Sequence, residues 1–199
     1  MPWKKILWLI LLVFPLMTLA EQHKHVKHKV WTKKYDRYFK KNSKHYFGPV
    51  INWRLFKAQA IAESNLNPKA VSNMGALGIM QIMPTTYKEI LQNQTGFGKI
   101  SEPRWNIAAA IYYNRQLYKR WKKKEIPPEE RMNFTFASYN AGFANILKAR
   151  KKLRQKLKKD NVYTKKIVSE WDSVAPFAPS QTRHYVRRIA GLMDITKKD

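Results

Sequence analysis

Apolar residues recur at three- and four-residue steps from residue 46 to the C-terminus. The first such segment carries Trp53, Phe56 and Ile61 at this spacing, which places them on one face of an α-helix that Pro68 ends. No stretch of the chain alternates convincingly between apolar and polar residues over the length of a strand. The predicted fold class is therefore mostly α, with little or no β-sheet.

Prolines and capping residues mark where the other helices begin. Pro84 suits the first turn of a second helix, and Pro128, followed by two glutamates, suits the start of another. Between them, Asn106 is expected to cap a longer helix. The two glycines within residues 71–79 predict a loop there, and the last predicted helix covers residues 182–196.

The first twenty residues have the features of an export signal. Two lysines precede an apolar run over residues 6–17, and small residues follow it up to Ala20. The run is shorter than the roughly 20 residues that a membrane-spanning helix needs, which favours a cleaved signal over a retained anchor. The expected location is therefore the periplasm or the cell envelope.

The charge predicts an anionic partner. The chain has 39 Lys and Arg against 13 Asp and Glu, a formal net charge of +26. Two stretches concentrate it: residues 21–45, here named the basic stem, and residues 148–166, where Asp160 is the one acid. Such a run is often only a solvated face; the alternative is contact with an anionic wall polymer or membrane surface. Export makes nucleic acid an unexpected partner.

Most other catalytic chemistries lack the residues they need. Without cysteine there is no disulfide, thiol nucleophile or thiolate metal site. His23, His25 and His28 lie in the basic stem without nearby carboxylate partners, so we expect a solvated tail and neither a metal nor a cofactor. Neither a serine-protease triad order nor an HExxH pattern is present.

Glu63 is the candidate for acid–base chemistry. It lies near the end of a mainly apolar predicted helix, and the next acid along the chain is Glu89. A carboxyl group packed against apolar residues has a raised pKa and stays protonated near neutral pH, as a general acid requires. By itself the signal is weak, because a lone glutamate at a helix end is more often a surface residue.

Glu63 opens an ordered series of short motifs. They are Glu63-Ser64, Asn67-Pro68, Ser72, the run from Gly75 to Pro84 (GALGIMQIMP), Ser138-Tyr139-Asn140-Ala141-Gly142, and Thr182-Arg183-His184-Tyr185-Val186. In letters and spacing this series resembles the catalytic domain of the soluble lytic transglycosylases, over roughly residues 50–191. The resemblance implies a lysozyme-like (goose-type lysozyme) helical fold and activity on peptidoglycan. It also implies a catalytic domain over residues 46–199, after the signal (1–20) and the basic stem (21–45).

The resemblance also implies roles for single residues. Glu63 matches the catalytic acid, and Tyr139 matches a tyrosine whose hydroxyl lies near that carboxyl. The residues expected to contact the substrate are Ser64, Ser72, Gln81, Met83, Tyr139, Asn140 and Gln181. The family commonly has glutamate where this chain has Gln181, which keeps a hydrogen-bonding amide but loses a charge.

The reaction that the resemblance implies is cleavage of the β-1,4 bond between N-acetylmuramic acid and N-acetylglucosamine, with formation of a 1,6-anhydro ring. No second acid stands near Glu63 in the sequence, as a two-carboxylate glycosidase would need. One alternative is a hydrolytic muramidase that recruits a distant acid, such as Asp172 or Glu102. Another is a non-catalytic envelope protein that binds peptidoglycan.

Overall fold

The computed structural model describes residues 29–197, so the expected export signal and the first part of the basic stem lie outside the described residues. The elements are α1 (Asp36–Phe47), α2 (Arg54–Ser64), α3 (Pro84–Asn93), α4 (Pro103–Lys122), α5 (Pro128–Ala141), α6 (Phe143–Lys159), η2 (Ile167–Ser169), α7 (Trp171–Val174), η3 (Ala175–Phe177) and α8 (Ser180–Ile195). Over these residues the only β pairing is two isolated bridges, in which Leu77 pairs with Val71 and with Ile82. The predicted mostly α class is confirmed. No helix between residues 29 and 197 combines the length and the apolar character needed to cross a membrane.

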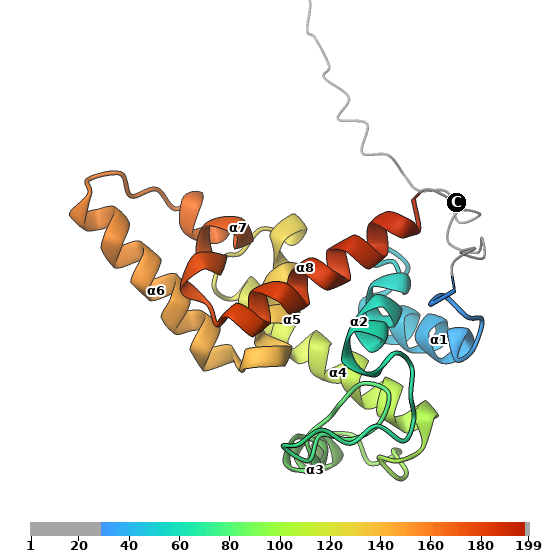
Figure 1. The fold of residues 1–199 in the computed structure, drawn as a ribbon. Helices are drawn as coiled ribbons and strands as arrows, with labels where there is room; N and C mark the ends of the chain where they lie inside the picture. Colours follow the sequence, from blue (N-terminus) through green and yellow to red (C-terminus); the bar gives the residue numbers. More distant parts are fainter. Residues whose placement is uncertain (1–28, 198–199) are drawn as a thin grey trace, which may run out of the picture.

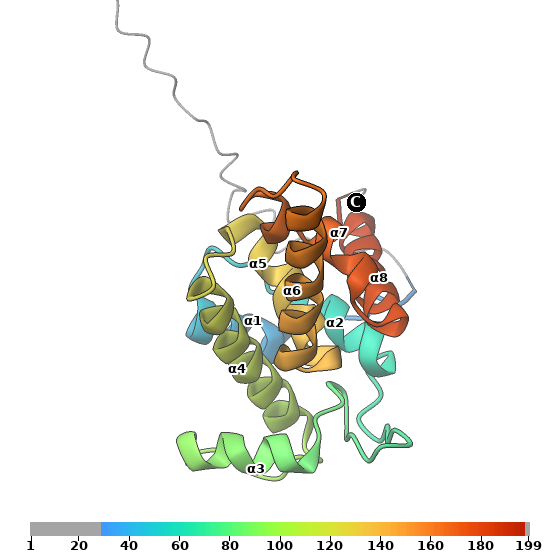
Figure 2. The same ribbon diagram turned by 90° about the vertical axis from the view of Figure 1, so that its left-hand side faces the viewer.

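The helices pack around α4 and α5. These two contact each other most extensively, α1 lies on α4, and α5 also contacts α6 and α8. Helix α2 packs against α8 although more than a hundred residues separate them. Figures 1 and 2 show α3 at one end of the molecule, beside the loop of residues 65–83, and α6 on a different side. The largest side chains fully buried between these helices include Phe39, Phe56, Ile107, Ile111, Trp121, Phe134 and Phe136.

Three helices begin with proline in the first turn, at Pro84, Pro103 and Pro128. Proline suits that position because its missing N–H has no intrahelical partner there and its φ is already helical. The expectation that Asn106 caps a helix is wrong, because α4 begins three residues earlier, at Pro103. Asn106 instead lies on the buried side of α4 and bonds to neighbouring loops.

The second half of the basic stem is packed structure. Residues from Asp36 onward form α1, and Trp31 and Phe39 are buried at 2% and 0% exposure. The ammonium group of Lys57, buried in α2, bonds to Asp36 and to the carbonyl of Thr32. The boundary expected at residue 46 therefore falls inside a packed helix.

Candidate active site

Glu63 lies in the last turn of α2, half-buried against α8. The Tyr185 hydroxyl, from α8, donates a hydrogen bond of 2.5 Å to Oε1 of Glu63. Because the two residues are 122 positions apart, this contact exists only once α2 and α8 have packed together.

Burial raises the pKa of Glu63 from 4.5 to about 7. The hydrogen bond from Tyr185 and the positive charge of Arg188 both lower this pKa, but they do not offset the loss of solvation. A carboxyl group with a pKa near 7 is populated in both protonation states at neutral pH. It is therefore suited to give up a proton in one step and to accept one in the next.

Two tyrosine hydroxyls lie in the same electrostatic environment. Burial, and then the charge of Glu63, raises the pKa of both Tyr139 and Tyr185 well above the ordinary value. Both stay protonated at neutral pH and act as hydrogen-bond donors. The Tyr139 hydroxyl donates to the carbonyl of Met80 at 2.7 Å, and its ring lies 5.5 Å from that of Tyr113.

Arg188 fixes the end of α2 that carries Glu63. Its guanidinium group donates to the carbonyls of Ile61 and Ala62 at 3.3 and 3.2 Å, and to Oδ1 of Asn65 at 3.0 Å. A cation at a helix C-terminus bonds to the last carbonyls of the helix and opposes the negative end of the helix dipole. The carbonyl of Ile61 also accepts from the Asn65 amide at 3.0 Å. The position of Glu63 thus depends on α8 through two side chains, Tyr185 and Arg188.

The loop of residues 65–83 is held against α4 by Asn106. Its side chain accepts from the Met80 amide at 2.8 Å and donates to the carbonyls of Leu77 and Ile100 at 3.0 and 3.1 Å. Gly78 has φ of +76°, and a Cβ there would meet the Asn106 amide at 2.7 Å. Glycine is thus required at this position, both for its φ and for the close approach.

Three of the expected substrate-contacting residues use their side chains to shape this loop. The Ser64 hydroxyl donates to the carbonyl of Ile79 at 2.8 Å, and the Ser72 hydroxyl accepts from the Ala76 amide at 2.9 Å. Gln81, at φ of +48°, donates through Nε2 to the carbonyls of Gly78 at 2.9 Å and Ala70 at 3.2 Å. These contacts give the three residues a structural task, whatever further contacts they make.

The other expected residues lie at element ends. Met83 is 36% exposed at the start of α3, and Gln181 is exposed in the first turn of α8. Asn140, near the end of α5, accepts a hydrogen bond of 2.8 Å from the hydroxyl of Thr182, which ties α5 to α8. Tyr139 and Asn140 thus link the end of α5 to the loop and to α8, the two elements beside Glu63.

The distant acids considered for a hydrolytic site have other surroundings. Glu102 forms an ion pair of 2.9 Å with Arg104 at the start of α4. Asp172 lines a groove with Trp171 and His184, between α7 and α8. Burial raises the pKa of Glu63, Tyr185 and Arg188 lower it, and no carboxylate of the described residues contributes.

Two residues near Glu63, Tyr185 and Gln59, have roles that the sequence did not predict. Tyr185 stood inside the motif of residues 182–186, but nothing in the sequence singled out its ring from that of Tyr139. Gln59 is completely buried four residues before Glu63, and therefore on the same face of α2. A polar side chain on the apolar face of the predicted helix was the signal that could have identified Gln59.

Comparison with known sequences places this site in a family. A family model described as the transglycosylase SLT domain matches residues 37–162, more than half of the chain. The membrane-bound lytic murein transglycosylase F of Maricaulis maris is 30% identical over 137 residues, which cover 68% of this chain and 27% of that protein. The protein of the same name from Vibrio vulnificus is 32% identical over 53% of this chain and 19% of its own length. This chain thus spans about a fifth to a quarter of the length of the curated relatives it matches.

Solved structures agree. The 70 kDa soluble lytic transglycosylase from Escherichia coli has a TM-score of 0.60 and 26% identity, over 82% of this chain and 24% of that one. An inactive mutant of the lytic transglycosylase Slt from Pseudomonas aeruginosa has a TM-score of 0.63 at 20% identity, over 83% of this chain and 24% of its own, which is a likeness of fold. The expected lysozyme-like helical fold is confirmed. Since the family model spans α1 to α6 and the site carries the expected glutamate, the chain belongs to the transglycosylase SLT domain family.

Proposed function

We propose that this chain is a peptidoglycan lytic transglycosylase with Glu63 as its catalytic residue. The observation that carries the proposal is a half-buried carboxyl group with a pKa of about 7, hydrogen-bonded by Tyr185 and with no carboxylate acting on it. A single carboxyl group in this state supports a reaction in which one residue is first the acid and then the base. Family membership supports peptidoglycan as the substrate.

The reaction proceeds in two steps and consumes no water. Glu63 first gives its proton to the glycosidic oxygen, and the bond from that oxygen to C1 of N-acetylmuramic acid breaks. The N-acetyl carbonyl of the same sugar supports the positive charge that develops at C1. Glu63 then takes the proton of the C6 hydroxyl, whose oxygen bonds to C1 and closes the 1,6-anhydro ring.

The seven residues expected to contact the substrate fall into two groups. Met83, Asn140 and Gln181 lie at element ends, where a glycan strand can reach them. Ser64, Ser72 and Gln81 act mainly by holding the loop of residues 65–83, and Tyr139 holds the same loop through Met80. Replacing Met83 is therefore expected to weaken substrate binding, whereas replacing Ser72 also lowers stability.

The products released from purified peptidoglycan test the proposal. Mass spectrometry is expected to show muropeptides lighter by one water than those with reducing ends, and Glu63→Gln should clear a cell-wall suspension at least 100-fold more slowly, on the order of the loss expected for a general acid. Reducing ends would assign a hydrolytic muramidase and require a second acid. Binding without release of products would assign a non-catalytic wall-binding protein.

The expected protonation state gives a further test. Bond cleavage needs Glu63 protonated, and its pKa is about 7. Activity is therefore expected to fall as the pH rises above 7, by about tenfold for each pH unit well beyond the pKa. Activity that stays constant between pH 6 and 9 would contradict Glu63 as the acid.

The envelope is the proposed location, with residues 1–20 as a cleaved export signal and the basic regions in contact with anionic envelope components. The net charge of +26 supports this contact. Binding to purified cell wall is expected to weaken as salt rises from 0.05 to about 0.5 M, because screening shortens the reach of charges. The N-terminal sequence of the exported protein shows whether cleavage follows Ala20.

A further inference from the structure

The C-terminal end of α6 combines dense positive charge with exposed apolar side chains. We name residues 151–166 the basic tip. Val162 and Tyr163 in it are 53% and 37% exposed. The exposed cations of the tip are Lys151, Lys152, Arg154, Lys156, Lys158, Lys159, Lys165 and Lys166. Figures 1 and 2 show that this end of α6 projects from the body of the molecule, away from α1 and α2.

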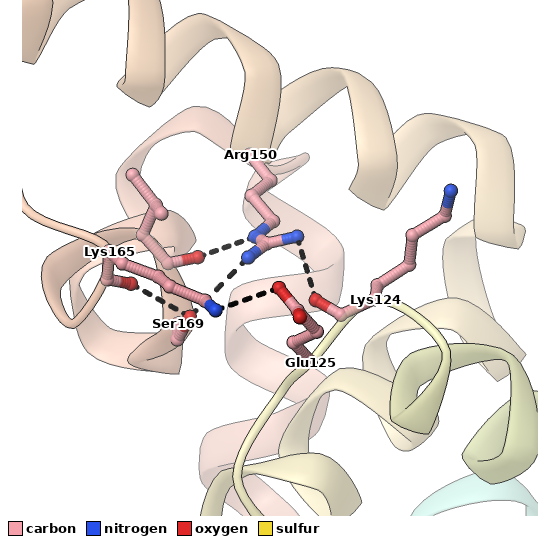
Figure 3. Close-up of polar contacts among 6 residues, drawn as sticks. Lys124, Glu125, Arg150, Lys165 and Ser169 are labelled. Atoms are coloured by element: carbon pink, nitrogen blue, oxygen red, sulfur yellow. Dashed lines mark hydrogen bonds and ion pairs between the residues drawn. The ribbon is translucent and has the colours of Figure 1, made fainter.

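The basic tip has a defined shape. Arg150 anchors α6 by donating to the carbonyls of Val168 and Lys124 and to the Ser169 hydroxyl, and Lys165 pairs with Glu125 at 2.9 Å (Figure 3). These contacts fasten α6 to the loop before α5 and to η2. The tip is therefore a fixed projection of the fold.

The turn that ends α6 presents the two apolar residues. Asn161 adopts φ of +56°, and the Val162 amide donates to the carbonyl of Leu157 at 2.9 Å, as at many helix C-termini. Arg154 and Lys158 lie 5.9 and 5.7 Å from the centre of the Tyr163 ring. The exposed ring is thus bordered by cations.

We propose that the basic tip docks on the surface of a bilayer that contains anionic phospholipid. Cations alone would suit any polyanion, but Val162 and Tyr163 gain free energy only where they leave water, at the boundary between headgroups and acyl chains. A tyrosine ring bordered by lysines suits that boundary, with the hydroxyl among the headgroups and the cations on lipid phosphates. A soluble wall polymer offers the charge without the apolar phase.

A local probe tests the docking independently of residues 1–20. The chain has no cysteine, so Val162→Cys in the full chain takes one environment-sensitive fluorophore, and Val50→Cys, 87% exposed between α1 and α2, is the matched control. Emission of the fluorophore at residue 162 is expected to shift to shorter wavelength with phosphatidylglycerol vesicles and not with phosphatidylcholine vesicles. Emission of the fluorophore at residue 50 is expected to stay unchanged with both. Lys158→Glu with Lys159→Glu should weaken the response by roughly tenfold or more. An equal response to both lipids, or a response only to purified wall polymer, would overturn the proposal.

A second observation concerns two buried amides behind Glu63. Gln59 of α2 and Asn114 of α4 are both 0% exposed, and Nδ2 of Asn114 donates to Oε1 of Gln59 at 2.7 Å. Within the described residues, neither Nε2 of Gln59 nor Oδ1 of Asn114 has a hydrogen-bond partner. The Gln59 amide nevertheless lies near enough to the Tyr185 hydroxyl to lower the pKa of that group. An unpaired buried amide group lowers the free energy of unfolding by about 1–3 kcal/mol, so its presence calls for an explanation.

The hydrogen bond from Asn114 decides which end of the Gln59 amide is available to Tyr185. Asn114 occupies the oxygen of the Gln59 amide, so the nitrogen of that amide is the atom left to act as a donor toward Tyr185. A hydroxyl has one proton, and a donor facing its oxygen directs that proton to the opposite side. The acceptor of the Tyr185 proton is Oε1 of Glu63, at 2.5 Å.

We infer that Gln59 and Asn114 are positioning residues that commit the Tyr185 hydroxyl to donate to Glu63. This inference rests on the proposed function, since the ionised Glu63 that Tyr185 stabilises is the form that accepts the C6 proton. The charged or titratable groups around Glu63 are Tyr185 and Arg188 from α8 and Tyr139 from α5. Arg188 and Tyr139 stay in place in every variant below, and Tyr185 is replaced only in the Tyr185→Phe background.

The titration of the Glu63 carboxyl group, followed by ¹³C NMR in the full chain, tests this. Gln59→Leu is expected to raise the Glu63 pKa by roughly 1 pH unit, because the donor that orients Tyr185 is lost. In a Tyr185→Phe background the same change should produce no further shift, since Gln59 acts through Tyr185. Asn114→Leu should shift the pKa in the same direction by less.

Thermal unfolding of each variant separates this effect from a merely structural one. Replacing both amides by leucine is expected to leave the melting temperature equal or higher, as an apolar pair leaves no buried polar atom unpaired. If the folded double variant titrates like the wild type, or if Gln59→Leu shifts the pKa equally without Tyr185, the inference is wrong. Because the titration needs no substrate, failure of the proposed function would show separately, as a wild type that titrates but releases no anhydro products.

Discussion

At the scale of single residues, the pKa of Glu63 links stability to pH. Its folded value of about 7 lies above the ordinary 4.5, so the folded state favours the protonated form. The stability it contributes is complete below pH 4.5 and is lost as the pH rises through 7. Glu63→Gln, which is always neutral, is therefore expected to be more stable than the wild type by roughly 3 kcal/mol at pH 8 and equal to it at pH 4. Urea unfolding at both pH values measures this, with Glu89→Gln on an exposed turn of α3 as the control. An equal gain at both pH values would mean that charge burial is not the cause.

At the scale of elements, the loop of residues 65–83 depends on its approach to α4. Gly75 and Gly78 both have positive φ, but a Cβ at Gly75 meets nothing within 4 Å, while one at Gly78 meets Asn106. Gly75→Ala is expected to cost about 1 kcal/mol from backbone strain alone. Gly78→Ala should cost about 3 kcal/mol, because it also displaces the side chain that bonds to Met80 and Leu77. Calorimetry of the two variants gives the free energy of unfolding that each loses, and the difference between the two losses is the cost of the steric contact with Asn106. Equal losses would show that the loop tolerates a shift away from α4.

At the scale of the whole molecule, charge repulsion opposes compactness. With 39 basic and 13 acidic residues, most cations have no acid to pair with, and four of the five ion pairs in the described part of the chain are largely exposed. Exposed pairs stabilise little, and salt screens the repulsion. The melting temperature is therefore expected to rise by a few degrees between about 0.02 and 0.3 M sodium chloride. The variant with Lys158→Glu and Lys159→Glu should rise less. A melting temperature that falls with salt would show that specific ion pairs outweigh the repulsion.

The sequence by itself determined the helical class, the proline-marked helix starts and the place of Glu63 near a helix end, because these follow from contacts within a few residues. Family motifs then directed attention to Glu63 and Tyr139. Only the tertiary structure decided that Tyr185 bonds to Glu63, that Tyr139 bonds to Met80 and that Arg188 caps α2. It also decided that Asn106, expected to cap a helix, is a buried side chain that bonds to Met80 and Leu77 in the loop. These contacts join residues 26 to 127 positions apart. No local pattern ranks such partners, since which phenol or amide meets a given group depends on how the helices pack.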